Sequence, residues 1–346
     1  NGKPFYLRLP DGDVSFPAIR FLFAPESPEF LIEQIFNYFL LAALWAGLLK
    51  LLLSRKRRKL RFTLLLGGAA VLLIPFFAVP RKLDRTDYRE LVARTGGRAV
   101  FAPIPYGPFE SVSGAYRSPS ARHWCGTDDI GRDVAVRMLY GARVSLAVGL
   151  GATLIVLVIG TLVGLVTGYF RGWFDLVSMR VVEIIMCFPT FLLLLILMSI
   201  LGDRKFEQSI LIVIAVIGLT GWIGVTFLVR GETLKQSALP YIQSCRVAGI
   251  PVWRILLIHL LPNIAGPILI SFTFGVAGAI LAESGLSFLG FGVKPPTASW
   301  GGLLRQASDD PLSYWHLTLF PGLILFFTVC SFNFTGEGLR RALSPK

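Results

Sequence analysis

Long apolar runs separated by polar, often basic, segments are the main pattern of this chain. The runs lie at residues 36–53, 62–79, 144–166, 184–201, 210–229, 264–281 and 317–332. Each is close to the roughly 20 residues that an α-helix needs to cross a hydrocarbon core. They lack the strict alternation of apolar and polar residues that is typical of a membrane β-strand. The pattern therefore predicts an all-α membrane protein, a polytopic bundle of transmembrane helices.

Composition also favours a lipid environment. Hydrophobic residues make up 54% of the chain and charged residues 16%, with a mean hydropathy of +0.65, whereas soluble domains carry about 25% charged residues. A net charge of +13 would suit nucleic acid. The basic residues, however, stand beside the apolar runs, above all at 55–59, as they do in cytoplasmic loops. We therefore expect contact with membrane lipid and no nucleic-acid partner.

The order of the predicted spans fixes a topology once one loop is placed. If the polar segment 230–262 faces the cytoplasm, the basic cluster 55–59 falls on the same side, as the positive-inside tendency requires. Segment 80–120 then lies outside, as a small cap or as a disordered linker. The predicted division is an extracytoplasmic segment 1–35, two transmembrane helices in 36–79, an extracytoplasmic segment 80–143, a core of five transmembrane helices in 144–336 and a cytoplasmic tail 337–346.

Segment 126–140 mixes charged and apolar residues just before the third apolar run. Its charges include Asp128, Arg132 and Asp133. We expect an amphipathic helix that lies at the outer membrane interface and ends at Gly141. The acidic residues would also suit a metal site, but the neighbouring arginines favour ion pairing.

Gly160, Gly164 and Gly168 recur every four residues within the third run. This spacing places them on one face of a helix, where small residues let a second helix approach closely. The pattern predicts a helix-packing seam.

The segment 230–262 carries the clearest candidate chemistry. It contains Gln243-Ser244-Cys245-Arg246-Val247-Ala248-Gly249 and ends near Leu261-Pro262-Asn263. A membrane protein without energy-converting chemistry of its own needs a cytoplasmic handle, and a short helix that moves as a body would serve. Gly249 lets the chain change direction without a Cβ penalty, and Pro262 suits the start of the following span. The alternative is a solvated loop with no partner.

Ordered motifs over residues 118–346 resemble one family of membrane permeases. The pattern of 243–249 with Leu261-Pro262 is similar to the coupling loop of ABC importer permeases, with Gln243, Ser244 and Cys245 where that loop has Glu-Ala-Ala. The other motifs resemble the dipeptide, oligopeptide and nickel branch, and they lie at 125–133, 140–146, 168–175, 179–180, 189, 283–301 and 332–340. The chain therefore resembles the second permease subunit of that branch.

The resemblance implies a fold, a location and partners. The fold is the type I ABC importer permease bundle with extracytoplasmic loop segments, in the inner membrane of a bacterium. The implied partners are a homologous permease, two ATP-binding subunits that hold ATP and Mg, and an extracytoplasmic solute-binding protein; no cofactor is expected in this chain. The two helices in 36–79 are one more than is usual for the branch, which implies an elaborated N-terminus with further membrane passage upstream.

The resemblance also implies roles for particular residues. The ATPase-coupling loop would comprise Tyr241, Gln243, Ser244, Cys245, Arg246, Gly249, His259 and Pro262. Gln243 would replace an acidic contact to the motor by a neutral hydrogen bond, and Cys245 would fill the space of a small residue. His259 would take part in hydrogen bonding between loop and helix.

An aromatic, glycine-containing segment follows the sixth apolar run. Together with Glu283 before it, Phe288, Phe291 and Trp300 are expected at the outer mouth of the translocation path, where a solute-binding protein would dock. A packed re-entrant turn is the alternative. Glu283 stands near a span end, from which it would reach an interface or a capping amide.

Several activities are excluded by what the sequence lacks. It contains no G-x-x-x-x-G-K-[ST] phosphate loop, and Cys125, Cys187, Cys245 and Cys330 show no C-x-x-C or metal-ligand spacing. The chain is therefore not expected to be an enzyme. The interpretation is an importer permease that moves di- or oligopeptides by alternating access. The alternatives are import of nickel chelates or another small solute, and a secondary transporter without a motor.

Overall fold

The computed structural model describes residues 3–10, 14–25, 30–52, 58–79, 86, 88–112, 114–202 and 209–343. The chain divides into two compact units, which are Asn1–Val144 with Pro295–Ser299 and Gln306–Thr318, and Ser145–Lys294 with Trp300–Arg305 and Leu319–Lys346. Most of the basic cluster 55–59 and the end of the predicted tail 337–346 lie outside the described residues.

A small antiparallel sheet in the first unit joins two segments that are distant in sequence. Its strands are β1 (Tyr6–Arg8), β2 (Val14–Ser15) and β3 (Arg98–Val100), in the order β2-β1-β3. Leu7 of β1 pairs with Ser15 on one side and Ala99 on the other. Since β1 precedes and β3 follows the two N-terminal apolar runs, the pairing brings Tyr6–Arg8 and Arg98–Val100 to the same side of any membrane that these runs would cross. The parity of the spans predicts the same arrangement.

Between these strands, α2 (Phe30–Leu52) and α3 (Arg58–Ala78) pack as a helical hairpin. Tyr38 donates to the Ala69 carbonyl at 3.3 Å, and the Trp45 indole donates to the Leu64 carbonyl at 3.1 Å. The described part of the hairpin contributes one shorter apolar helix, Thr63–Phe76, and no full-length candidate span. That α2 and α3 cross the membrane stays a prediction. The short helices α1 (Pro17–Phe23) and α4 (Tyr88–Thr95) complete this region.

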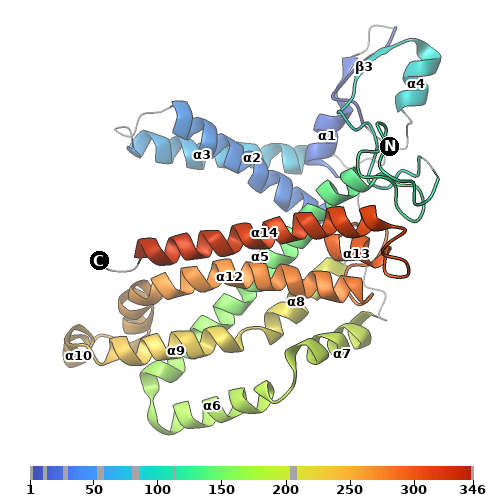
Figure 1. The fold of residues 1–346 in the computed structure, drawn as a ribbon. Helices are drawn as coiled ribbons and strands as arrows, with labels where there is room; N and C mark the ends of the chain where they lie inside the picture. Colours follow the sequence, from blue (N-terminus) through green and yellow to red (C-terminus); the bar gives the residue numbers. More distant parts are fainter. Residues whose placement is uncertain are drawn as a thin grey trace. The chain divides into compact units, whose positions relative to one another are not determined.

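Three helical segments among the described residues are long and apolar enough to cross a membrane. They are α5 (Val134–Phe170), the continuous stretch Val252–Phe288 and α14 (Trp315–Leu343) (Figure 1). Two bent pairs raise the number of candidate spans to five, namely α6 (Gly172–Met186) with α7 (Thr190–Gly202), and α8 (Ser209–Thr220) with α9 (Ile223–Ser237). Five is the number of spans expected for residues 144–336.

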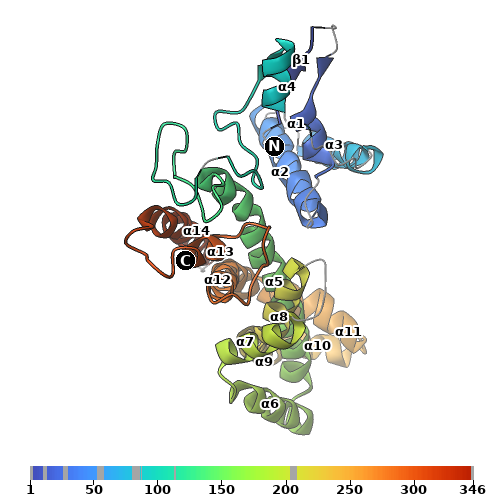
Figure 2. The ribbon, with the colours of Figure 1, turned by 90° about the vertical axis from the view of Figure 1, so that its right-hand side faces the viewer.

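The run 184–201 is not one straight helix, contrary to expectation. α6 and α7 meet at a bend of 75° across Cys187–Pro189. Proline has no N–H to bond within a helix, and it disfavours helical backbone at the residue before it. The chain therefore breaks at Phe188-Pro189. α6 runs along the edge of the second unit (Figure 1 and Figure 2).

The predicted glycine seam is confirmed, and its partner is α9. A Cβ on Gly160 would lie 2.7 Å from Val225, and one on Gly164 would lie 2.8 Å from the Thr226 carbonyl. Thr226 also donates to the Gly160 carbonyl at 3.4 Å. Because side chains on α5 would displace these atoms, the glycines set the spacing of the two helices.

The predicted interfacial helix at 126–140 is wrong. α5 begins at Val134 and continues through Gly141, whereas the preceding residues form an irregular loop. Gly126 and Gly131 have φ of +79° and +83°, which a right-handed helix does not contain. Asp133 instead accepts the backbone N–H of Val136 at 3.0 Å, the contact of a helix N-cap.

The charges of this loop are buried rather than exposed at an interface. Asp128 accepts Nε of Arg132 at 2.6 Å and lies 3.2 Å from Nε of Arg137, and Asp133 contacts Nδ1 of His123 at 2.8 Å. All five side chains are at most 7% exposed. We call these residues the buried ion cluster. Ion pairing with the neighbouring arginines, which the sequence favoured, is what the structure shows for Asp128 and Asp129.

Candidate functional site

The segment 230–262 is mostly helical rather than a loop. α9 extends to Ser237, a short helix α10 (Pro240–Val247) follows, and α11 (Val252–Arg254) begins the next long stretch. Figure 1 shows α10 beyond the end of α9, at one end of the second unit. Leu239 is extended at ψ 150°, as expected before a proline, and Pro240 then starts α10.

Gly249 ends α10 as predicted. Its φ is +69°, and no atom lies within 4 Å of the place a Cβ would take. The neighbouring N–H groups bond back into α10, from Ile250 to the Cys245 carbonyl and from Gly249 to the Arg246 carbonyl, both at 3.1 Å. A left-handed glycine of this kind is typical of helix C-termini. Gly249 is therefore required for backbone conformation, not for space.

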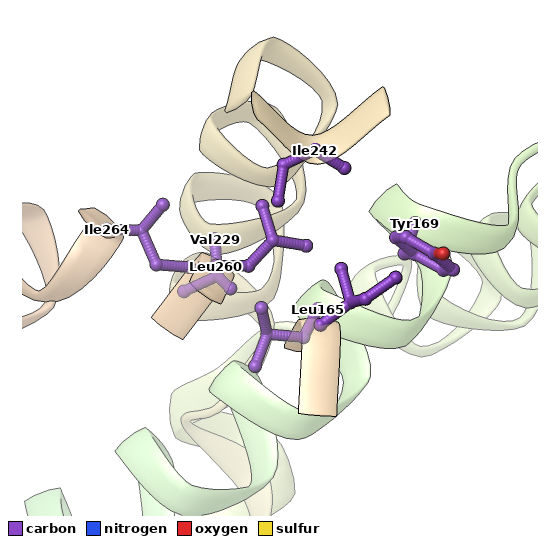
Figure 3. Packing of buried hydrophobic residues seen from close by; sticks show 7 residues of the cluster. Leu165, Tyr169, Val229, Ile242, Leu260 and Ile264 are labelled. Atoms are coloured by element: carbon purple, nitrogen blue, oxygen red, sulfur yellow. The ribbon is translucent and has the colours of Figure 1, made fainter. Parts of the chain in front are cut away.

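One face of α10 is fixed in an apolar cluster (Figure 3). Its buried members come from α5, α9, α10, the π-turn η2 (Ile255–Leu260) and α12 (Leu261–Phe288), and they are Leu165, Tyr169, Val229, Ile242, Ile255, Leu260 and Ile264. Ile242 is fully buried, and Tyr241 and Cys245 pack against the cluster from the same helix. The prediction that Cys245 fills space agrees with this position.

Polar contacts hold the rim of the same face. The Tyr241 hydroxyl donates to Oε1 of Gln236 at 3.1 Å, and burial raises the pKa of this phenol. The guanidinium of Arg246 lies 4.5 Å from the centre of the Tyr169 ring, a cation–π contact between α10 and α5. Both contacts bind α10 to its own bundle.

The other face of α10 is exposed, and the helix contains no acidic residue. Gln243 and Ser244 bond only locally, to the carbonyls of Ala238 at 3.2 Å and Pro240 at 3.0 Å. Val247 is 90% exposed at the tip of the helix. An apolar side chain so fully in contact with water costs free energy, and a partner surface would remove that cost. We call Gln243, Ser244, Val247 and Ala248 the exposed face of α10.

Pro262 lies at the start of α12, as expected, and follows directly on the π-turn η2. The π-turn η2 leads directly into α12, so that Val252–Phe288 is one helical stretch. A wider turn accommodates the proline, which removes one backbone donor. The side chain of Asn263 supplies a donor to the His259 carbonyl at 2.6 Å. Hydrogen bonding at His259 was expected, and it is the backbone carbonyl, not the imidazole, that accepts this bond.

The residues expected at an outer mouth fall into two groups. Glu283 is fully buried, and its carboxylate accepts the hydroxyls of Ser145 at 3.0 Å and Ser287 at 2.6 Å. Of the two expectations for Glu283, contact with an interface is wrong, because the side chain is fully buried and serines on α5 and α12 bond it inside the bundle. Trp300 is 1% exposed, at the start of α13 (Trp300–Arg305), and its backbone N–H lies 3.5 Å from Oγ of Ser145.

Phe288 and Phe291 differ from that buried group. They are 42% and 40% exposed at the end of α12 and just after it. The structure thus brings together Glu283 and Trp300 through Ser145, and leaves the two aromatic rings at the surface. Docking of a partner protein on these rings stays a prediction.

Sequence reasoning missed one polar contact of this unit. Arg230 on α9 pairs with Asp175 on α6, with two N–O distances of 2.6 Å. The motif 168–175 pointed to this region, but the two partners are 55 residues apart in sequence. Only the fold shows that they meet.

The candidate spans, which are long and apolar enough to cross a membrane, define the class of this chain as a helical membrane protein. Residues 160–346 match the family model described as "Binding-protein-dependent transport system inner membrane component", and the chain belongs to this family. It is an inner-membrane permease subunit of an ATP-binding cassette importer.

Similarity to named proteins agrees with this placement. The chain is 39% identical over 228 residues to the glutathione transport system permease protein GsiD of Pectobacterium atrosepticum, covering 66% of this chain and 74% of the relative. It is 38% identical over 256 residues to the dipeptide transport system permease protein DppC of Bacillus subtilis, covering 71% and 78%. The fold matches an inward-facing MetNI methionine ABC transporter chain, with a TM-score of 0.50 at 17% identity over 60% of this chain and 97% of that one.

Proposed function

We propose that this permease moves short peptides across the inner membrane by alternating access driven by partner ATPases. The observation that carries the proposal is α10, with Ile242 buried in the apolar cluster and Val247 90% exposed on the opposite face. A helix held firmly on one side and exposed on the other suits a handle that a motor grips.

Displacement of α10 would reach the bundle through the apolar cluster. Protein interiors are close-packed and transmit strain, and this cluster joins α10 to α5, α9 and α12. A shift of Ile242 therefore moves its neighbours together rather than deforming one side chain. The rearrangement of these helices would change the side of the membrane to which the solute path is open.

The proposed assembly contains a homologous permease, two ATP-binding subunits and an extracytoplasmic solute-binding protein. ATP and Mg would be held by the ATP-binding subunits, because this sequence has no phosphate loop. The exposed face of α10 would enter a groove of the motor. Since Gln243 is neutral, its contact there would be an uncharged hydrogen bond.

The docking of α10 is tested with the purified complex in proteoliposomes. Val247→Asp places a charge at the proposed contact, and we expect loss of ATP-linked uptake and of binding to the ATPase subunits. Val247→Thr keeps the shape of the side chain and serves as the matched control. Undiminished uptake in Val247→Asp would count against the handle, and uptake that never depends on ATP would favour a secondary transporter.

The substrate class is supported by the relatives, which are named as dipeptide and glutathione permeases. Dipeptides and glutathione are both short peptides. We expect ATP-dependent uptake of a labelled dipeptide with the cognate binding protein, reduced by excess unlabelled peptide. Uptake of a nickel chelate without uptake of peptide would assign the chain to the alternative substrate.

A further inference from the structure

A two-point ion pair joins α6 to α9 in the second unit. Arg230 donates Nε to Oδ1 of Asp175 and Nη2 to Oδ2, both at 2.6 Å. Paired hydrogen bonds between a guanidinium and a carboxylate fix orientation as well as distance. The side chains are 27% and 13% exposed, so water reaches only the edge of the pair. The contact therefore holds the two helices at a defined angle.

A second tie starts at the turn between α5 and α6. Arg171 has φ 51° and Gly172 has φ 62°, and a positive φ is uncommon for a residue with a Cβ. The turn carries the Arg171 guanidinium to the C-terminal end of α9, where Nη2 donates to the Leu234 carbonyl at 2.9 Å and to Oγ of Ser237 at 2.8 Å. A cation is favoured there by the free carbonyls of the helix end.

α6 has few apolar contacts of its own to hold it. Met179 and Val182 are its buried residues, whereas Trp173 and Ile184 are 79% and 64% exposed. Both views place α6 at the edge of the unit (Figure 1 and Figure 2). The position of α6 relative to α9 therefore depends on the two polar ties.

The same part of α9 lies directly on the end of α5 that contacts α10. A Cβ on Gly168 would be 2.8 Å from the Arg230 carbonyl, and the next residue, Tyr169, stacks with Arg246 of α10 at 4.5 Å. A movement of α10 is thus passed to Arg230 through two contacts, from Arg246 to Tyr169 and from the adjacent Gly168 to the Arg230 carbonyl. From Arg230 the ion pair continues to Asp175.

We propose that the Asp175–Arg230 pair, supported by Arg171, is a strut that makes α6 turn with α9 as one body when α10 is displaced. The inference rests on the proposed function of α10. The three side chains are positioning residues, since they act by orienting helices.

The first test measures the amount of solute moved per ATP hydrolysed by the assembled complex. Asp175→Asn and Arg230→Gln each break the pair, and we expect this ratio to fall about fivefold or more. The exchanged variant Asp175→Arg with Arg230→Asp should recover part of the loss. A purely structural role would lower the amount of complex and leave the ratio unchanged, which would overturn the proposal.

The chain offers a matched control on α6 itself. Arg180 and Glu183 form an exposed pair with an N–O distance of 2.5 Å and side chains 69% and 49% exposed. Arg180→Gln with Glu183→Gln removes one positive and one negative charge from α6 without changing α9. The ratio should stay at the wild-type value. Arg230→Lys, which keeps the charge but loses the two-point contact, is the second variant if Asp175→Asn does not assemble.

The second test needs no transport and so separates failure of the strut from failure of the proposed function. Nitroxide labels are attached at Leu176→Cys and Lys235→Cys, both exposed, after the four native cysteines are replaced by Ala. Pulsed electron paramagnetic resonance should give a narrow distance distribution with and without ATP, and a broader one in Asp175→Asn. Identical distance distributions in the labelled protein with Asp175 and in its Asp175→Asn variant would overturn the proposal.

Discussion

The apolar cluster around Ile242 and the buried ion cluster around Asp128 are both buried, and they are held together by different interactions. The first consists of aliphatic side chains and one tyrosine from several helices. The second satisfies charge with charge, since Asp128 contacts both Arg132 and Arg137. Hydrophobic burial has no preferred direction, whereas ion pairs and hydrogen bonds weaken quickly when their geometry changes.

This difference suits two mechanical tasks. Packed side chains can pass between discrete arrangements that bury similar apolar area, as helices do when they slide on one another. A buried ion pair that is opened leaves uncompensated charge. The Ile242 cluster is therefore suited to helices that move with a motor, and the ion cluster is suited to a loop that stays closed.

The largest effect is expected from opening the buried ion cluster. Asp128→Ala leaves Arg132 and Arg137 without their shared carboxylate, and we expect a loss of about 3–5 kcal/mol in the free energy of unfolding. Thermal unfolding in detergent measures it. Asp129→Asn is the control, because the Asp129 side chain is 40% exposed and its pair should contribute about 1 kcal/mol at most. If Asp128→Ala and Asp129→Asn lowered the free energy of unfolding equally, burial would not make the Asp128 pairs more important for stability than the Asp129 pair.

Truncation of Ile242 tests the apolar cluster. Ile242→Ala removes the fully buried side chain of α10, and such a change costs about 2–5 kcal/mol. We expect α10 to detach locally, seen as faster hydrogen exchange of its amides. Val247→Ala, at the 90% exposed position, should change stability by no more than about 0.5 kcal/mol. If hydrogen exchange of the α10 amides were unchanged in Ile242→Ala, α10 would be held instead by the polar contacts of Tyr241 and Arg246.

Adding a methyl group to the glycine seam should have a smaller effect. In Gly164→Ala the new Cβ would lie 2.8 Å from the Thr226 carbonyl, and overpacking of this kind costs about 1–3 kcal/mol. Gly231→Ala on α9 has no atom within 4 Å of the new Cβ, and should stabilise that helix by about 0.5–1 kcal/mol. Thermal unfolding of both variants checks the prediction, which fails if they shift the transition in the same direction.

The smallest effect is expected at the π-turn. Asn263→Ala removes the bond to the His259 carbonyl, and one hydrogen bond contributes about 0.5–1.5 kcal/mol. Hydrogen exchange near Pro262 should rise while the rest of α12 stays protected. Ser244→Ala, which removes an exposed local bond, serves as control. If Asn263→Ala lowered the free energy of unfolding more than Ile242→Ala does, the π-turn η2, and not the apolar cluster, would be the main support of residues 230–262.

How far the sequence predicts each region follows from the range of its interactions. The helical bundle, the glycine seam and the turn at Gly249 depend on composition and short spacings, and these features were predicted. Ion pairing between Asp128 and Arg132 was expected, but its burial was not, because the burial of Asp128 depends on the folded path of a loop that has no periodic sequence pattern. The bend at Pro189 is signalled by the proline itself. The Asp175–Arg230 pair depends on how α6 packs against α9, which the sequence does not specify locally.

The pairing of β1 with β3 has a consequence for synthesis of the chain. Tyr6–Arg8 is made before α2 and α3, whereas Arg98–Val100 is made after them. The central strand of the sheet therefore waits for its second partner until the whole helical hairpin has left the ribosome. Closure of the sheet then marks a completed N-terminal hairpin, and a chain in which only one of the two helices crossed the membrane would be unable to close it.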